Sequence, residues 1–558
     1  MEKVKISSSL SKRASEMLKR FEPTQKNVKN LTSQLEPFIP HHIHETKVCI
    51  PAKLTLWPSQ IAKLTIILCI LAFITWTIYI RYFHLSRIPG PFWAAYTRLW
   101  LSKTLASGES AKVFVDINKR YGPLARIGPN NLITDDPEVA RSILAARSHY
   151  TRGPWFDSIR IDPHVANIVS ERHTGKHNHL RHQMRAGYTG KEIEGTEQVI
   201  DARIADFMNR ISSKWLSTPH QPTNFDIGQR IQFLALDVIT HLCFGAPLGF
   251  MTQDRDVSDF VRTIEQQLPI VQHFSVFLEF NWLLKNLTRI SLIKRLLLPR
   301  NTDTTGIGKI MGITQSVAGA RFKPGAVQKK DMMGSFIKHG LSASEVEAEI
   351  SISLVAGSDT TATSMRATLL AIITNPIAYS KLRAEISQGI RNGAISEPIT
   401  DAESRKMPYL QACILEGLRR FPPITQLRER IVPPEGDMIH GYEIPGGTYI
   451  GLNAWGLQLN PVFGEDAHVF RPERWLEADP AQLAAMMRVW ELIFGHGNTK
   501  CLGQGIAFMV LNKIFVELFR RFDISIVDPH RPWKSTCYGI FFQKDFFVRV
   551  SRSGIGSI

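Results

Sequence analysis

Apolar residues recur every three or four positions through most of the chain after residue 96, which is the spacing of amphipathic helices. Two stretches differ, because residues 125–134 and 432–450 alternate apolar with polar positions and carry turn residues. The second stretch contains GYEIPGG at residues 441–447, a composition that predicts a hairpin turn. We find no internal repeat. The pattern therefore predicts a mainly α fold with small β-sheets.

One long helix is expected to begin at Ser342, where Ser342-Ala343-Ser344-Glu345 has the form of a capping box, and to run past Leu370. Inside it lies AGSDTT at residues 356–361. A glycine beside several hydroxyl side chains is a poor choice for a helix interior, so this run predicts a local distortion. Taken alone, such a run is more often a packing defect than a site.

An apolar run at residues 64–80 contains no charged residue and reaches the lower length limit of a membrane-spanning helix. A buried core helix is the alternative interpretation. The flanking Lys63 and Arg81, and the proline-rich segment that follows, favour a single anchor. The resulting prediction has four parts: a polar N-terminal extension at 1–60, a transmembrane anchor at 61–82, a proline-rich hinge at 83–95 and a globular domain at 96–558.

Composition narrows the classes of function. A hydrophobic fraction of 44% excludes a disordered protein. The six cysteines show no Cys-x-x-Cys spacing, which indicates reduced thiols and no zinc ribbon. The net charge of +17 is spread along the chain without a nucleic-acid motif, so we expect no nucleic-acid partner. An anionic membrane surface or an acidic protein partner explains the excess better.

The run FGHGNTKCLG at residues 494–503 places Cys501 in a glycine-rich turn, and an apolar helical pattern follows from Ile506. Glycines let the backbone approach a flat ligand, and the positive end of a helix stabilises a thiolate. A thiolate held in this way suits haem iron, where it favours O–O cleavage. For a cysteine considered alone, a buried free thiol would be the better interpretation.

This run resembles the haem-binding loop of the cytochrome P450 superfamily, Phe-Gly-x-Gly-x-Arg-x-Cys-x-Gly. The resemblance implies the cytochrome P450 fold, with Cys501 as the axial ligand of haem b iron and with Phe494 and Gly497 in the cofactor-binding loop. The chain departs from the family at Thr499, where the usual residue is an arginine that pairs with a haem propionate. Either Thr499 is a weaker neutral donor, or Lys500 or another base compensates.

The same resemblance assigns roles within residues 356–361. In the family, the glycine that corresponds to Gly357 makes room for dioxygen. Thr360 would hold water at the reacting oxygen, and Asp359 would control the supply of protons from solvent. Heterolytic O–O cleavage consumes protons that bulk water must not deliver freely, so Thr360 and Asp359 are the predicted catalytic residues.

Glu416 and Arg419 have opposite charges at i and i+3 on one helix face, which alone is a weak signal. Downstream, FRPERW at residues 470–475 resembles the second arginine element of the family. The resemblance implies that Glu416, Arg419 and Arg474 form a buried ion network behind the haem. A network that satisfies its own charges can be tolerated in a core, so its predicted role is structural.

Four histidines lie close together in the sequence: His173, His177, His179 and His182. The first two have the i, i+4 spacing of zinc ligands, but no glutamate base or third ligand follows at a recognised spacing. His177-x-x-x-Arg181 instead resembles the family's Trp-x-x-x-Arg, whose side chains bind haem propionates. Arg430 is expected to be another propionate ligand, with Arg428 as the alternative.

The segments that shape the substrate pocket in the family correspond here to the loop before His177, residues 245–300, Ile424 with Thr425, and residues 540–542. These segments are apolar enough for a lipophilic substrate, yet each is equally plausible as core. Residues 490–550 are similar to fungal members of the pisatin-demethylase type, which favours secondary metabolism of terpenoids or polyketides.

The resemblance, which covers residues 88–550, predicts a haem-thiolate monooxygenase domain at 96–558 that inserts one oxygen atom from O2 into a lipophilic small molecule. Electrons are expected from NADPH through a separate cytochrome P450 reductase, because no flavin or dinucleotide motif is visible. A single pass through the endoplasmic reticulum membrane, with a cytosolic catalytic domain, would leave Asn30 as a glycosylation acceptor. The alternatives are an O2-independent haem-thiolate isomerase or dehydratase, and a non-catalytic membrane haem-binding module.

Overall fold

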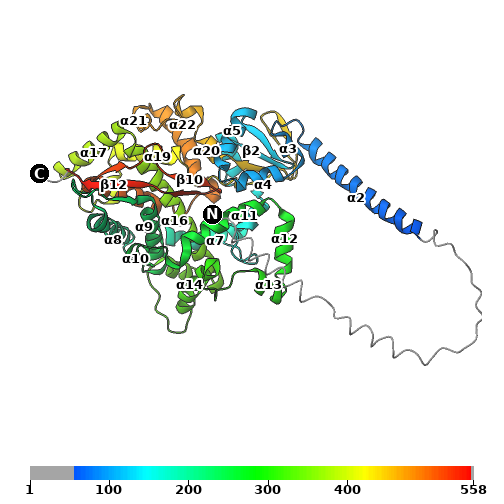
Figure 1. Ribbon diagram of the computed structural model, residues 1–558, viewed down its shortest axis with the longest axis horizontal. Coiled ribbons are helices and arrows are strands. Elements are labelled where there is room, and N and C mark those ends of the chain that lie inside the picture. Colours follow the sequence, from blue (N-terminus) through cyan, green and yellow to red (C-terminus); the bar gives the residue numbers. More distant parts are fainter. Residues whose placement is uncertain (1–55, 555–558) are drawn as a thin grey trace, which may run out of the picture. The chain divides into compact units, whose positions relative to one another are not determined.

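A computed structural model describes residues 56–554 of the protein, and it is mainly helical with small sheets (Figure 1). The helices of the N-terminal half are α2 (Leu56–His84), α3 (Phe92–Tyr96), α4 (Leu99–Ala106), α5 (Ser110–Tyr121), α6 (Pro137–Leu144), α7 (Thr174–Tyr188), α8 (Thr196–Arg210), α9 (Ile227–Phe244), α10 (Phe250–Gln253) and α11 (Phe260–Ser275). Those that follow are α12 (Leu278–Leu287), α13 (Ser291–Leu297), α14 (Gly306–Arg321), α15 (Met332–Lys338), α16 (Ala343–Ile373), α17 (Pro376–Arg391), α18 (Asp401–Ser404), α19 (Pro408–Arg420), α20 (Ala454–Leu457), α21 (Arg474–Glu477), α22 (Pro480–Trp490) and α23 (Gln504–Arg521).

The strands form four small sheets. They are β1 (Leu124–Gly128), β2 (Asn131–Thr134), β3 (Thr151–Arg152), β4 (Asn224–Asp226), β5 (Arg430–Ile431), β6 (Asp437–Ile439), β7 (Tyr442–Ile444), β8 (Tyr449–Leu452), β9 (Phe522–Ile526), β10 (Lys534–Cys537), β11 (Phe541–Lys544) and β12 (Phe547–Arg552). The largest sheet has the order β1-β2-β8-β5-β3, and the others are β4-β12-β9, β10-β11 and β6-β7. Both predicted β regions are therefore confirmed.

The predicted hairpin is present, but its turn lies one position earlier than the composition suggested. β6 and β7 pair in antiparallel fashion, with Ile439 opposite Tyr442. His440 and Gly441 between them have φ of 51° and 76°, which are left-handed values favoured in two-residue hairpin turns. Residues 442–444, in the middle of the expected run, belong to β7, and the run ends in a second turn at Gly446 and Gly447.

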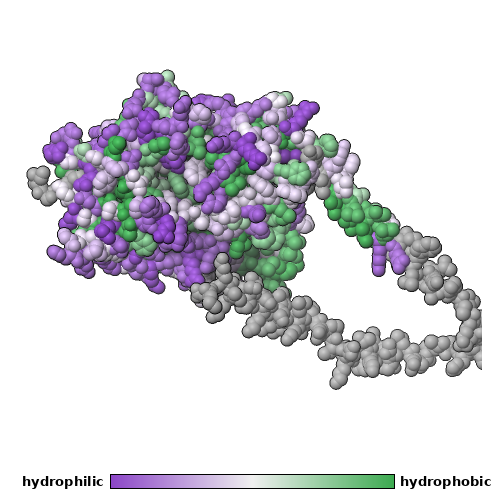
Figure 2. Space-filling view, turned by 45° about the horizontal axis from the view of Figure 1, so that its top comes forward, coloured by the Kyte–Doolittle hydropathy of each residue, from purple (hydrophilic) through white to green (hydrophobic). Residues whose placement is uncertain are grey.

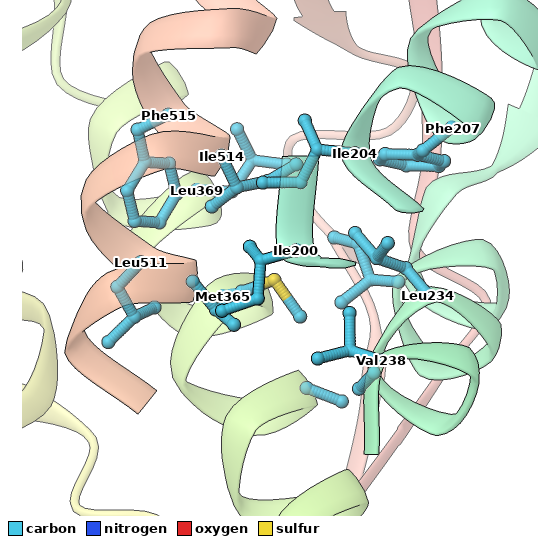
Figure 3. Packing of buried hydrophobic residues seen from close by; sticks show 14 of the residues in the cluster. Ile200, Ile204, Phe207, Leu234, Val238, Met365, Leu369, Leu511, Ile514 and Phe515 are labelled. Carbon is cyan, nitrogen blue, oxygen red and sulfur yellow. The ribbon is translucent and has the colours of Figure 1, made fainter. Parts of the chain in front are cut away.

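Four helices form the centre of the hydrophobic core. Figure 3 shows apolar side chains of α8, α9, α16 and α23 packed against one another. The labelled residues are Ile200, Ile204, Phe207, Leu234, Val238, Met365, Leu369, Leu511, Ile514 and Phe515. Full burial of each such side chain contributes roughly 1.5–3 kcal/mol. This packing fixes α16 relative to α23, and therefore fixes residues 356–361 relative to the cysteine loop that precedes α23.

The long predicted helix is confirmed as α16, with the capping box of Ser342 and Glu345 at its start. The helix continues through residues 356–361 without a break. Thr360 donates its hydroxyl to the carbonyl of Ala356 (2.7 Å), and Ser364 donates to that of Thr360 (2.8 Å). Because these hydroxyls are satisfied within the helix, the helix is not interrupted at this run, where we had expected a distortion.

The proline-rich segment packs closely against the largest sheet. Arg126 in β1 donates its backbone N–H to the carbonyl of Pro89 (2.8 Å). A Cβ atom on Gly90 would lie 2.1 Å from the carbonyl oxygen of Arg126, so only glycine fits this approach. Leu85 and Ile88 are buried in the same apolar cluster as residues of β1, β2 and β8. The proline-rich segment is thus held in place by its contacts with the largest sheet.

The apolar run at residues 64–80 lies within α2, as a helical anchor requires. Within residues 56–554, however, no helix is both long and apolar enough to cross a membrane. The transmembrane role assigned to residues 61–82 is therefore not supported. Localisation in the endoplasmic reticulum stays a prediction, and the glycosylation expected at Asn30 lies outside the described residues.

Apolar side chains also gather on part of the globular surface (Figure 2). The exposed apolar residues of α11, α12 and α13 include Phe274, Phe280, Trp282, Leu283, Leu292, Leu296 and Leu297. Exposed patches of this kind mark surfaces that contact a partner or a membrane. The predicted membrane contact is compatible with this patch and stays a prediction.

Candidate active site

The cavity that contains Cys501, called the main cavity below, has a volume of about 290 Å³ and is lined by residues of α7, α9 and α16, of the loop at residues 494–503 and of the start of α23. Its apolar lining includes Leu144, Phe156, Val169, Ala235, Val238, Ile239, Ala356, Ile424, Phe494, Leu502, Ile506 and Val510. The positively charged side chains that line it are Arg152, Arg181, Arg428, Arg430 and Lys500. Among the residues that the structure describes, no aspartate or glutamate lines this cavity.

Cys501 lines the cavity, and its side chain is accessible there. The Cys501 N–H donates to the carbonyl of Phe494 (2.7 Å), which closes the loop. Gly497 has φ of 58°, and a Cβ atom on it would lie 2.3 Å from the carbonyl oxygen of Leu144. Gly497 is therefore required by backbone packing against α6. It does not itself line the cavity, whereas Phe494 does.

The electrostatic surroundings of Cys501 act in two directions. Burial raises the pKa of the Cys501 thiol, while the backbone N–H groups of Gly503 and Gln504 and the guanidinium of Arg181 act to lower the pKa. The predicted influence of the following helix is thus present, but burial outweighs it. A metal ion bound to the sulfur would reverse this balance, because a coordinating thiol is deprotonated.

The opposite wall of the cavity is one face of α16. Ser353, Gly357 and Thr360 all line the cavity. The Ser353 hydroxyl lies 2.6 Å from the hydroxyl of Tyr188 in α7, which ties these two helices together. A Cβ atom on Gly357 would lie 2.9 Å from Ile239, so a larger residue would push α9 away. The Thr360 side chain is accessible within this wall.

Asp359 is buried beside the cavity and does not line it. Its Oδ1 accepts a hydrogen bond from Nε2 of Gln232 (2.7 Å), and its Oδ2 has no partner within the described part of the chain. Burial raises the pKa of Asp359 to about 6, although the nearby Arg366 acts to lower it. Sequence reasoning missed Gln232, which meets Asp359 only because α9 packs against α16, and Arg366, which lies about two turns further along α16.

Two arginines are brought together at one end of the cavity by strand pairing. β3 and β5 are antiparallel, and Arg152 is the direct partner of Arg430. Nη1 of Arg152 donates to the carbonyls of Ile168, Val169 and Glu171 at 2.7–3.0 Å. Arg152 was not among the predicted site residues, because no local motif marks it.

His177 is buried in α7, and its side chain bonds to Arg152. Its Nε2 lies 3.1 Å from Nη2 of Arg152, and its Nδ1 lies 3.2 Å from Oδ1 of Asn178. Burial and the charge of Arg152 lower the pKa of His177 to about 4, so the ring is neutral and its Nε2 accepts from Arg152. His177 therefore contacts Arg152, and its binding of a haem propionate stays a prediction.

Arg430, Arg181 and Thr499 line the same end of the cavity. Nη1 of Arg430 donates to the carbonyl of Arg428 (2.7 Å), and its Nη2 donates to the hydroxyl of Thr499 (3.4 Å). Burial lowers the pKa of Arg430 to about 9. Thr499 thus takes part in the cationic cluster as a neutral acceptor, in the position where the family has an arginine.

The predicted ion network of Glu416, Arg419 and Arg474 is present, and all three side chains are almost fully buried. Arg419 donates Nε and Nη2 to the two oxygens of Glu416, both at 2.8 Å. Nε of Arg474 and the indole N–H of Trp475 also donate hydrogen bonds to the carboxylate of Glu416, at 3.0 Å each. Nη1 of Arg419 donates to the carbonyls of Gln458 and Ala467.

Of the predicted pocket residues, Ile424 lines the cavity and Thr425 does not. The Thr425 hydroxyl lies 2.9 Å from Sγ of Cys537, in a buried contact. Residues 540–542 are buried and pack behind Ile424, to which Ile540 is bridged. Residues 245–300 do not line this cavity either.

Several known proteins are similar to this chain over most of its length. The family model described as Cytochrome P450 matches residues 87–545. "Cytochrome P450 monooxygenase aba1" of Botryotinia fuckeliana strain B05.10 is 38% identical over 474 residues, which cover 84% of this chain and 92% of that protein. "Cytochrome P450 monooxygenase ABA1" of Pyricularia oryzae strain 70-15 is 38% identical over 483 residues (85% and 93%). "Pisatin demethylase" of Fusarium vanettenii is 28% identical over 474 residues (83% and 88%).

Proposed function

The chain belongs to the cytochrome P450 family and is an oxidoreductase, and from this premise we propose that it inserts one oxygen atom from O2 into a lipophilic small molecule. The observation that carries the proposal is the position of Cys501, whose side chain faces the same cavity as Gly357 and Thr360. A sulfur donor on one wall and a hydroxyl on the other is the arrangement that a haem-thiolate monooxygenase needs.

The residues around the cavity fit haem b. Cys501 is the one thiol that lines the cavity among residues 56–554, and a thiolate is the donor that this chemistry uses. The walls are apolar, as a porphyrin requires. The cationic end, with Arg181, Arg430 and Arg152, matches the two propionates. We propose that Arg181 and Arg430 bind the propionates, with Thr499 as a neutral donor and with His177 holding Arg152 in place.

Haem bound through a thiolate supplies activation of O2 with cleavage of the O–O bond. The chain's own residues would control the protons. We propose that Thr360 turns its hydroxyl from the Ala356 carbonyl to hold a water in the cavity. Asp359, which has a half-satisfied carboxyl and a pKa of about 6, can hold or release a proton near neutral pH. The apolar walls exclude bulk water from the reacting centre.

The proposed reaction needs an electron donor and a substrate. Electrons are proposed to come from NADPH through a separate flavoprotein reductase, since the sequence carries no flavin or dinucleotide motif. The substrate is proposed to be a secondary metabolite, with the similarity to pisatin demethylase as support. The apolar lining of the cavity supports a lipophilic molecule.

Replacement of the cysteine tests the proposal. The ferrous carbon monoxide complex of the full chain should show the red-shifted Soret band of a thiolate-ligated haem. Cys501→Ser should lose this band and all NADPH-dependent oxidation, because a neutral ligand does not donate electron density as a thiolate does. Cys243→Ser is a matched control, since this thiol is buried away from the cavity. A red-shifted band that persists in Cys501→Ser would disprove the proposal.

A further inference from the structure

Residues 426–430 form a wall between the main cavity and a second cavity of about 310 Å³. Arg428 and Arg430 line the main cavity, whereas the alternate residues Leu427 and Glu429 line the second one. Successive side chains of this segment thus face opposite cavities, as is usual for extended chain. Among residues 56–554, no residue lines both cavities, so the second cavity lies outside the site assigned to the haem.

Glu429 presents a buried carboxyl group to the second cavity, since it lines that cavity and is only 5% exposed. Its Oε1 accepts a hydrogen bond from Nδ2 of Asn131 (2.7 Å). Within residues 56–554 it forms no ion pair, and its Oε2 has no hydrogen-bond partner although protein atoms do not enclose this oxygen. The open surface of Oε2 therefore faces the cavity.

The backbone around Glu429 fixes the position of this carboxyl group. Gly153 donates its N–H to the carbonyl of Glu429 (3.0 Å), and the next residue, Arg430, pairs with Arg152 of β3. Burial raises the pKa of Glu429 to about 7, while the hydrogen bond from Asn131 acts to lower it. The group is thus only partly ionised at neutral pH, and a cation bound beside it would favour the ionised form.

The other charged residues that line the second cavity compensate each other. Nη2 of Arg98 lies 2.8 Å from Oε1 of Glu279, and both residues belong to the lining. Nη1 of Arg98 also donates to the carbonyl of Val276 (3.1 Å). Because this pair is neutral, an ionised Glu429 leaves the described lining with one net negative charge. A single bound cation would compensate that charge.

The uncharged part of the lining favours an organic cation. The aromatic residues Trp155 and Tyr449 line the cavity, and its apolar residues include Leu105, Leu278 and Leu427. The faces of aromatic rings attract organic cations. A metal ion is a poorer match, because the described residues contain no group of three or more His, Cys, Asp or Glu side chains that could hold one. The volume of about 310 Å³ is at the lower end of the range for small-molecule sites.

We propose that the second cavity is a binding site for a small organic cation with N–H donors, such as an alkylguanidinium or alkylammonium ion, and that Glu429 is its counter-ion. The N–H groups would donate to Oε2, and the hydrocarbon part would lie against the leucines and the aromatic rings. This site goes beyond the proposed oxidation, because the cation would bind across the wall from Cys501. The arginines that line the main cavity disfavour a cation there.

Butylguanidinium and butylurea test the proposal in the haem-loaded full chain, because they share one shape and one hydrocarbon chain and differ in charge. A guanidinium ion stays protonated, so it does not coordinate haem iron. Isothermal titration calorimetry measures binding, and the Soret band is recorded over the same concentrations. Wild type should bind butylguanidinium about 10- to 100-fold more tightly than butylurea, as expected for a charge-assisted hydrogen bond, with the Soret band unchanged.

Two variants show whether Glu429 is the source of this preference. Glu429→Gln should remove the preference, because the amide keeps an acceptor for Asn131 but carries no charge. Glu138→Gln is the matched control, since it removes an exposed carboxylate that pairs with Arg488. This control should retain the preference for butylguanidinium.

The outcomes separate this proposal from its alternatives. If wild type shows no preference for the cation, or if Glu429→Gln retains the preference, the proposal is wrong. A Soret shift that saturates together with binding would place the cation in the main cavity and would also overturn it. If Glu429→Gln does not fold, a crystal structure of wild type with butylguanidinium decides. The guanidinium should lie within hydrogen-bond distance of Oε2 of Glu429, and a guanidinium bound elsewhere would contradict the proposal.

Discussion

Two groups of arginines within residues 56–554 differ in what compensates their charge. Arg419 and Arg474 share the carboxylate of Glu416, Arg474 also pairs with Asp466 (2.9 Å), and backbone carbonyls accept from their remaining donors. The arginines of the main cavity have no carboxylate of their own chain beside them. Both groups are expensive to bury, since removing a charge from water costs several kcal/mol per ion. Glu416 and Asp466 offset this cost for the first group, whereas in the second group Arg152 and Arg430 are bonded to neutral partners within the described residues.

This difference distinguishes a structural role from a functional one without reference to any motif. A network that is neutral and hydrogen-bonded in the folded chain stabilises the fold, and breaking it leaves a buried charge unpaired. A cluster of like charges that faces a cavity destabilises the empty protein and attracts anions.

The largest expected effect is at the neutral network. Glu416→Gln should lower the free energy of unfolding by about 3–5 kcal/mol, because Arg419 would stay buried without a counter-charge. Denaturant unfolding followed by circular dichroism measures this. Glu138→Gln removes an exposed pair with Arg488 and should change the free energy by less than about 1 kcal/mol. Equal effects of the two substitutions would contradict the comparison.

The charge of Asp359 is compensated in part, since its buried carboxyl has one hydrogen bond, from Gln232, and the nearby Arg366 acts to lower its pKa. Its pKa is raised from 3.8 to about 6, so the folded state binds the proton more tightly than the unfolded state, and stability from this group is lost as pH rises through this window. Asn does not titrate. The stability of Asp359→Asn relative to wild type should therefore increase by about 1.4 kcal/mol between pH 5 and pH 7.5. A difference that is constant with pH would show that Asp359 is not perturbed.

Removing an arginine of the main cavity should not lower the free energy of unfolding as Glu416→Gln does. Arg430→Met in the haem-free protein should leave the free energy of unfolding within about 1 kcal/mol of wild type or raise it, because an uncompensated cation is removed. The haem-loaded variant should lose haem to apomyoglobin about tenfold faster, since a propionate contact is lost. Destabilisation of the haem-free variant as large as that of Glu416→Gln would mean that the two groups are not different in kind.

The smallest effect on stability is expected at Thr360, where the consequence is functional. Thr360→Ala should bind haem normally and divert electrons from NADPH to hydrogen peroxide, because the proton supply is disturbed. Thr374→Ala is the matched control, since Thr374 donates to the carbonyl of Leu370 at the same 2.7 Å but at the end of α16. The ratio of hydrogen peroxide to NADPH, measured with added reductase, should rise in the first variant and not in the second. An unchanged ratio would remove Thr360 from the proton path.

Much of this molecule is visible in local sequence patterns. The capping box at Ser342 and Glu345 fixes the start of α16 because both partners lie within one helical turn. The glycine-rich run before α23 places Cys501 at a helix start, and the spacing of Glu416 and Arg419 places both on one face of α19. These features involve residues within a few positions of one another, so the chain determines them before it folds.

Other features were decided by packing over long distances. Arg152 meets Arg430 because β3 pairs with β5, and Gln232 meets Asp359 because α9 crosses α16. The contact of His177 with Arg152 likewise joins residues 25 positions apart, and no local motif predicted it. The sequence by itself thus determined the family, the thiol and the helix that faces it. Only the tertiary structure decided which arginines are neutralised, because charge compensation depends on neighbours that lie far apart in the chain, as Arg152 and Arg430 do.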